Sequence, residues 1–129
     1  FDNDTFDAVI NVESSHCYGN MTSFVNEVYR VLKTGGKFSW TDFRGKDMIK
    51  ETEGIFEQSK FNCIQKKTIT PQVLNALDNI HVQKIDMIKN HVPQFLQKAF
   101  KDFAGVKDSQ IYNAFKNGNA EYLFKTLKK

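Results

Sequence analysis

The chain has few of the residues that build disulfide-bonded, zinc-binding or membrane-spanning folds. Its 129 residues include only two cysteines, Cys17 and Cys63, far apart in the sequence. This excludes a disulfide scaffold and a zinc site built on paired cysteines. No apolar run approaches the roughly 20 residues needed to cross a bilayer, and no signal peptide opens the sequence. These absences predict a cytoplasmic globular domain with two free thiols and no membrane span.

An excess of charge of one sign is also missing. The 18 Lys and Arg residues are scattered among 15 Asp and Glu residues, and the net charge is +3. A nucleic-acid-binding domain gathers its basic residues on one face or stripe, whereas only the final residues, 125–129, are locally basic here. Nucleic acid is therefore not an expected partner.

A β-α-β unit is predicted near the start of the chain. The run Phe6–Ile10 is apolar with little alternation, which is typical of a central parallel strand covered on both faces. Asn20 suits the N-cap of a helix with apolar residues at helical spacing, and Gly35 suits a left-handed C-cap. A strand from Lys37 to Asp42 follows. Because the connection is short, we expect the two strands to be adjacent and parallel.

The later part of the chain predicts a helix at about Met48–Gln58, a strand near Phe61 and a last strand at 122–127. The alternation in the last strand is typical of an antiparallel or edge strand. The expected fold class is therefore α/β: a doubly wound, mostly parallel sheet with a helical insertion at about residues 71–117 before an antiparallel last strand. We expect residues 1–129 to belong to one domain.

The helical insertion opens at Thr70 and Pro71, a cap followed by proline at the first helical position. Pro93 restarts the helical pattern, and a final short helix is expected over about 109–116. The clearest amphipathic stripe of the sequence follows Pro93 and consists of Val92, Phe95, Leu96, Ala99, Phe100 and Phe103. This stripe suits ordinary core packing as well as a lid over an apolar pocket.

A cluster of reactive side chains follows the first strand. Glu13, His16 and Cys17 stand directly after it, and Asp42 closes the next strand. Ligands of open parallel sheets bind beyond the carboxyl ends of the strands, so we expect His16 and Asp42 to converge at one cleft. A histidine oriented by a carboxylate can take a proton from a hydroxyl. The alternative is structural: Asp42 caps the following helix, and His16 is an ordinary loop residue.

Two other chemistries fit the cluster poorly. The spacing of Glu13 and His16 matches the Glu-x-x-His of di-iron sites, but these need a second copy and a helical setting, and the sequence has neither. Cys17 is adjacent to His16, and neighbouring residues on a turning backbone point in different directions. We therefore expect no metal and no thiol nucleophile.

Three blocks of this sequence carry a family resemblance. They are Phe6-Asp7 with Glu13-Ser14-Ser15-His16, then the helix segment EVYRVLKTGG, and then Asp42-Phe43-Arg44. Together they resemble the second half of a class I S-adenosylmethionine-dependent methyltransferase, in which such blocks occur at the same spacing. Thr34 replaces the usual proline, and Cys17 stands where close relatives often carry a second histidine.

The resemblance implies a function as well as a fold. The Thr70-Pro71 turn and the FAGVK stretch at 103–107 resemble a subgroup acting on sugars, phenols and lipid-like natural products. It implies methyl transfer from S-adenosylmethionine to a small organic or lipid-like acceptor, with a hydroxyl as the nucleophile. His16 would be the general base and Asp42 its orienting partner. Asn11, Val12 and Glu13 would face the sulfonium and methionine part of the cofactor, and the helical insertion would form a lid.

The chain contains no G-x-G-x-x-G segment. The resemblance places that loop, and the acidic residue that holds the ribose, upstream of Phe1. We therefore expect a C-terminal part of a methyltransferase domain that is incomplete and inactive alone. A second hypothesis is a non-catalytic module that associates through an exposed sheet edge. A dinucleotide-dependent oxidoreductase fits less well, because the Glu13 to His16 segment has no role in that chemistry.

Overall fold

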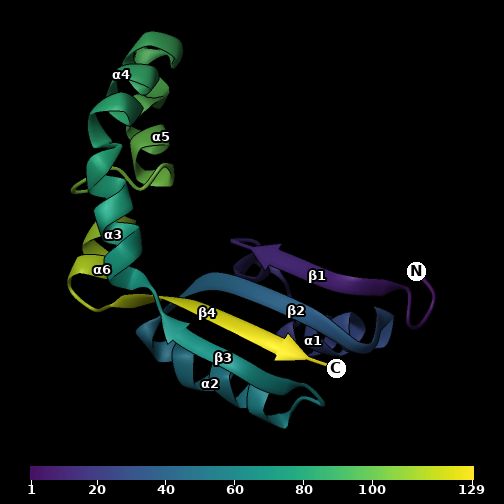
Figure 1. Cartoon of the computed structure of the whole chain (residues 1–129). Helices are drawn as coiled ribbons and strands as arrows, with labels where there is room; N and C mark the ends of the chain where they lie inside the picture. Colours follow the sequence, from purple (N-terminus) through teal and green to yellow (C-terminus); the bar gives the residue numbers. More distant parts are fainter. The chain divides into compact units, whose positions relative to one another are not determined.

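The computed structural model describes all 129 residues. A four-stranded sheet carries the strand order β1-β2-β4-β3 (Figure 1). The strands are β1 (Phe6–Val12), β2 (Leu32–Gly45), β3 (Asn62–Thr68) and β4 (Ala120–Lys128). The chain divides into two compact units, a sheet unit made by Phe1–Thr68 with Glu121–Lys129, and a helical unit made by Ile69–Ala120. The α/β fold class predicted from the sequence is confirmed.

The predicted β-α-β unit is present. Strand β1 pairs in parallel with β2, and helix α1 (Met21–Val31) connects them. The Asn20 side chain accepts a hydrogen bond from the backbone N–H of Ser23, as expected of an N-cap. The prediction for Gly35 was wrong in part: its φ is +83°, but it lies inside β2. The helix ends earlier because Leu32 already has extended backbone angles.

Within these 129 residues the first strand lies at the edge of the sheet, whereas the sequence predicts a central strand for the whole domain. β1 pairs only with β2 here. Its apolar side chains Ile10 and Val12 are 74% and 56% exposed. An apolar run indicates faces suited to burial, but only the strand order decides whether another element covers them. Within this chain nothing packs on that part of β1.

Helices α1 and α2 (Lys46–Gln58) cover one face of the sheet. Phe38 and Trp40 of β2 are completely buried beneath them, in the core cluster formed by Val25, Val28, Leu32, Phe38, Trp40, Phe56, Phe61, Leu123 and Leu127. Large apolar side chains buried in this way supply most of the stabilisation of a domain of this size. This core fixes the end of β2, where the polar cluster lies.

The last strand is antiparallel, as predicted. β4 pairs with β3 in antiparallel register, with Cys63 opposite Leu127, and its arrow in Figure 1 runs opposite to that of β1. The buried Lys125 of β4 forms an ion pair of 2.8 Å with Glu53 of α2. This pair ties the helix layer to the sheet. Both cysteines are free and exposed.

The helical unit contains four α-helices and one short 3₁₀ helix: α3 (Thr70–Asn79), α4 (His81–His91), η2 (Gln94–Leu96), α5 (Gln97–Phe103) and α6 (Gln110–Lys116). Thr70 is the first residue of α3 rather than its cap, and Ile69 flanks the helix instead. The buried apolar residues of this unit are Ile88, Val106, Tyr112, Phe115 and Ala120. None of its helices is long and apolar enough to span a membrane.

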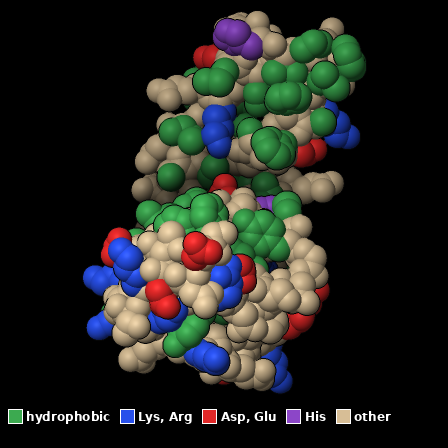
Figure 2. Space-filling view, turned by 90° about the vertical axis from the view of Figure 1, so that its right-hand side faces the viewer, with side chains coloured by type: hydrophobic (Ala, Val, Ile, Leu, Met, Phe, Trp, Pro, Cys, Tyr) green, Lys and Arg blue, Asp and Glu red, His purple; other side chains and the backbone are tan.

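The amphipathic stripe around α5 does not form core. Phe95 and Phe103 are 83% and 91% exposed, and Leu96 and Phe100 are exposed as well. Figure 2 shows hydrophobic side chains at the surface of the helical unit. Of the two roles that the sequence left open, packing in the core is excluded within this chain, and the stripe is available for another apolar partner.

Candidate active site

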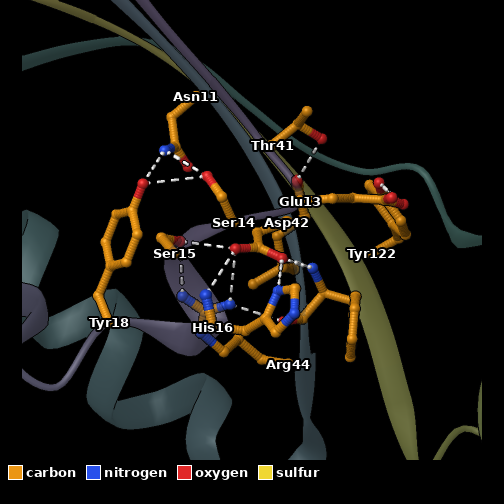
Figure 3. Close-up of polar contacts among 12 residues, drawn as sticks. Asn11, Glu13, Ser14, Ser15, His16, Tyr18, Thr41, Asp42, Arg44 and Tyr122 are labelled. Carbon is orange, nitrogen blue, oxygen red and sulfur yellow. Dashed lines mark hydrogen bonds and ion pairs between the residues drawn. The ribbon is translucent and has the colours of Figure 1, made fainter.

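The carboxyl ends of β1 and β2 lie side by side, and the polar cluster is built there. The backbone N–H of Glu13 donates to the carbonyl of Thr41 at 3.0 Å, so the loop after β1 stays attached to the end of β2. The short helix η1 (Ser15–Cys17) then turns His16 toward Asp42. The Nδ1 atom of His16 lies 2.8 Å from Oδ1 of Asp42 (Figure 3). The two side chains meet directly, although their catalytic role stays a prediction.

Asp42 is the centre of the cluster and is fully buried. Its carboxylate accepts hydrogen bonds from the Ser15 hydroxyl at 2.6 Å and from the backbone N–H groups of His16 and Phe43, each at 2.9 Å. Burial raises the pKa of this carboxyl, but the hydrogen bonds from Ser15 and His16 and the charge of Arg44 outweigh it and hold the pKa below its ordinary value. Asp42 is therefore an ionised anchor.

Ser15 links this anchor to two further side chains of β2. Its Oγ accepts hydrogen bonds from the Trp40 indole N–H at 2.8 Å and from Nη2 of Arg44 at 2.9 Å. Tryptophan and arginine can only donate, so the single hydroxyl proton of Ser15 must point toward Asp42. The direction of every hydrogen bond around Asp42 is thus set by the residue types.

His16 is held by one nitrogen only. Because the ionised Asp42 can only accept, Nδ1 carries the proton in the neutral ring, and Nε2 keeps its lone pair. The ring packs against Phe43 with a centroid distance of 4.6 Å, and 31% of the side chain remains exposed. An oriented imidazole with one accessible nitrogen is suited, in its neutral form, to accept a proton.

Tyr122 of β4 reaches the same site from 109 residues further along the chain. Its hydroxyl donates to Oε1 of Glu13, whose backbone is in the left-handed region with φ +45°. Burial and the neighbouring Glu13 raise the pKa of Tyr122, so the phenol remains protonated. Glu13 is therefore bound near the start of β4, where the Tyr122 ring lies beside the Phe43 ring that contacts His16.

The predicted cofactor-facing residues differ in their surroundings. Asn11 is 7% exposed, and its Nδ2 donates to the Ser14 hydroxyl at 2.8 Å and to the Tyr18 hydroxyl at 3.2 Å. Its Oδ1 is buried without a hydrogen-bond partner. A buried acceptor left in this state is costly, and an N–H donor of a ligand would satisfy it. Val12 presents an exposed apolar side chain.

Four residues of the site were not assigned from the sequence: Ser15, Trp40, Arg44 and Tyr122. A signal for Arg44 was present, because alternate residues of β2 are buried and Trp40, Asp42 and Arg44 occupy that buried face. Two opposite charges at positions reserved for core residues indicate a buried ion pair. Tyr122 had no such signal, since its partner Glu13 is distant in sequence.

Known proteins to which this chain is similar include several methyltransferases. Residues 1–40 match the family model described as a methyltransferase domain. The chain is 34% identical over 122 residues to the phthiotriol/phenolphthiotriol dimycocerosates methyltransferase of Mycobacterium leprae (strain TN). This match covers 95% of the chain and 45% of that relative. It is 28% identical over 123 residues to the fatty-acid O-methyltransferase of Mycolicibacterium smegmatis, covering 95% and 44%.

A solved structure shows the same fold. Phosphoethanolamine N-methyltransferase 2 of Haemonchus contortus, in complex with S-adenosyl-L-methionine, superimposes with a TM-score of 0.78 at 17% identity, over 100% of this chain and 34% of that one. The likeness at this identity concerns the fold alone. The chain spans about half the length of the curated relatives it matches.

Proposed function

We propose that this chain, which belongs to the class I S-adenosylmethionine-dependent methyltransferases, carries part of a site that methylates a hydroxyl of a lipid-like molecule. The part it carries is the one that binds the methyl acceptor. The observation that carries this proposal is the His16 ring, held by Asp42 at 2.8 Å through Nδ1 with the other ring nitrogen free. A hydroxyl is a weak nucleophile, and a positioned base removes its proton as it attacks.

The cofactor of this reaction would be S-adenosylmethionine, which supplies an electrophilic methyl group on a sulfonium. Asn11 fits a place beside it, because the unpartnered Oδ1 offers an acceptor to an N–H donor at the end of β1. The carboxylate of Glu13 is also near this end, bound to Tyr122. In the proposed reaction, Nε2 of His16 would take the hydroxyl proton as the acceptor oxygen attacks the methyl carbon. The bond between that carbon and the sulfonium sulfur would break, S-adenosylhomocysteine would leave, and Asp42 would stabilise the imidazolium.

The lipid class of the acceptor is supported by two independent features. The relatives named above act on dimycocerosates and on fatty acids, according to their names. The helical unit also exposes the stripe that contains Phe95, Phe100 and Phe103. We assign this stripe to the hydrocarbon part of the acceptor, which gives the insertion at residues 71–117 the role of an apolar lid.

The acceptor atom can be tested directly. The intact enzyme is incubated with S-adenosylmethionine labelled on the methyl group and with a long-chain lipid that carries a hydroxyl. The control is the same lipid with hydrogen in place of the hydroxyl, and a third sample carries an amine there. We expect label in the hydroxylated lipid only. Label in the amine alone, or in none of the three, would contradict the proposal.

The chain by itself is expected to bind S-adenosylmethionine weakly or not at all. It contains no glycine-rich G-x-G-x-x-G segment, and in folds of this kind such a loop binds the cofactor through backbone amides. Isothermal titration calorimetry on the 129-residue chain measures this. A low-micromolar affinity, about −8 kcal/mol, would show that the cofactor site lies within these residues.

The exposed stripe gives a second prediction. The double variant Phe95→Ser with Phe103→Ser should lower kcat/KM for a long-chain acceptor by about tenfold or more, because each lost phenyl ring removes apolar contact with the chain. The rate for a short-chain acceptor should change little. Ile64→Ser on β3 is the matched control, since Ile64 is also exposed. Equal losses for long and short acceptors would refute the assignment of the stripe.

A second candidate function is association without catalysis. The open edge of β1 and the exposed Ile10 and Val12 favour it, because an uncovered strand can pair with another chain. Sedimentation velocity of the chain would show a dimer that Ile10→Lys disrupts. A monomer at all concentrations would leave this alternative without support.

A further inference from the structure

The sheet unit contains a buried pair of opposite charges whose purpose goes beyond holding the fold. Asp42 and Arg44 are 0% and 3% exposed, and Nη1 of Arg44 lies 3.2 Å from Oδ2 of Asp42. Taking two charges out of water is costly, and a buried ion pair often contributes little to stability when compared with apolar residues of the same size. A role in the chemistry of the neighbouring His16 accounts for it better.

The position of Arg44 is fixed from several sides. Its guanidinium donates to the Phe43 carbonyl at 2.7 Å and to Ser15 at 2.9 Å, and it lies 5.3 Å from the centre of the Trp40 ring. These contacts prevent the charge from moving away from Asp42. Ser15 connects the two charged groups a second time, because its hydroxyl accepts a hydrogen bond from Arg44 and donates one to Asp42.

Charge balance then decides the state of His16. A buried carboxylate is stable only beside a compensating positive charge, and two groups next to Asp42 can supply one: Arg44 and a protonated His16. Arginine is always protonated. The other ionisable groups nearby are Glu13 and Tyr122, which bind each other, and Cys17, which is exposed. With Arg44 present, the imidazole need not carry the charge.

We propose that Arg44 is a positioning residue whose positive charge compensates that of Asp42 and so leaves the His16 ring neutral. Nε2 is then free to accept the proton of the acceptor. Arg44 contacts the carboxylate directly and also through Ser15. Without that charge, the nearest cation for Asp42 would be the His16 imidazolium, which has no lone pair left on Nε2. The inference rests on the proposed role of His16 for its catalytic meaning, although the charge state of the ring can be measured without activity.

The test is an NMR titration of the His16 ring protons in the 129-residue chain. The sequence has three histidines, and His16→Gln assigns the signal. Arg44→Met removes the charge and keeps much of the volume, whereas Arg44→Lys keeps the charge. We expect the pH at which the ring takes up its second proton to rise by about one unit or more in Arg44→Met. It should stay near the wild-type value in Arg44→Lys.

Substitutions of Ser15 and Ser14 disturb the buried cluster less and serve as the test in case Arg44→Met fails to fold. Ser15→Ala removes the contact through Ser15 but leaves the direct contact of Arg44 with Asp42, so it should raise the same midpoint by a smaller amount. Ser14→Ala lies outside this network and should not raise it. Trp40 is the only tryptophan, so its fluorescence reports whether each variant keeps the buried cluster. In the intact enzyme, the acid limb of the pH profile of kcat/KM should move with the NMR midpoint.

Each outcome decides a different point. An unchanged midpoint in folded Arg44→Met, or in folded Ser15→Ala where Arg44→Met does not fold, overturns the inference. So does an equal rise in Arg44→Met and Arg44→Lys, because charge would not be the cause. If the midpoint rises as expected but His16→Ala keeps full turnover, the charge balance stands and the proposed role of His16 as base fails.

Discussion

Replacing His16 by alanine is expected to lower the turnover of the intact enzyme by about 10²–10⁴-fold, the usual contribution of a positioned general base. The ring accepts a proton only as the hydroxyl attacks, so the loss should appear in kcat and kcat/KM together. Binding of the cofactor should change little, because the interaction of His16 with Asp42 uses Nδ1 and leaves the Asn11 amide undisturbed. Steady-state kinetics and a cofactor titration measure both effects.

A matched control is His91→Ala. His91 is exposed in α4, and its ring contacts only the backbone carbonyl of Met87, so this variant should keep nearly full turnover. Wild-type turnover in His16→Ala would mean that the ring is a structural partner of Asp42. Catalysis would then depend on bringing the acceptor close to the methyl group.

Asp42→Asn is expected to destabilise the chain by about 3–5 kcal/mol, the cost of breaking one side of a buried ion pair. Arg44 would keep its charge in the interior without a carboxylate. The asparagine amide would also place a donor group among five donors: the Ser15 hydroxyl, the His16 ring and backbone N–H, the Phe43 N–H and Arg44. Urea unfolding followed by circular dichroism measures the change.

The control for this variant is Asp7→Asn. Asp7 pairs with Lys33 at 2.9 Å, but both side chains are largely exposed, and surface pairs of this kind contribute about 0–1 kcal/mol. If Asp42→Asn were no more destabilising than Asp7→Asn, the network around Asp42 could not be the anchor of the site. Turnover should fall less in Asp42→Asn than in His16→Ala, since the imidazole remains.

The same carboxylate predicts how stability depends on pH. The pKa of Asp42 is lower in the folded chain than its ordinary value of 3.8, so the folded state takes up this proton at lower pH than the unfolded chain does. Its contribution is complete above the unfolded pKa and is lost as the pH falls through the folded one. The free energy of unfolding of the wild type should therefore fall more steeply in acid than that of Asp42→Asn.

Local patterns in the sequence sufficed for the elements that frame the site. Periodic apolar residues and the Asn20 cap predicted α1, and the apolar runs predicted β1 and β2 as a parallel pair. Because adjacent parallel strands end at the same edge of a sheet, the convergence of His16 and Asp42 followed from their positions alone. These features depend on residues that are close in sequence or on a single short crossover.

For two hydrophobic patterns the sequence did not show which element covers them. The apolar run of β1 suggested a central strand, and within these 129 residues the strand order places it at the edge. The stripe that contains Phe95 and Phe103 has the spacing of a buried helix face, yet both rings are exposed. A hydrophobic pattern specifies that a face can be buried, and it does not specify which element covers it.

The sequence by itself determined the α/β class, the parallel pair and the residue types available at the strand ends, because these follow from periodicity and turn chemistry. Only the tertiary structure decided which of those side chains form hydrogen bonds with each other. Ser15 meets Trp40 across 25 residues, and Tyr122 meets Glu13 across 109. Such pairs form because the strand order β1-β2-β4 places the loop after β1 and the start of β4 on either side of β2, and no local pattern in the chain records which two residues will face one another there.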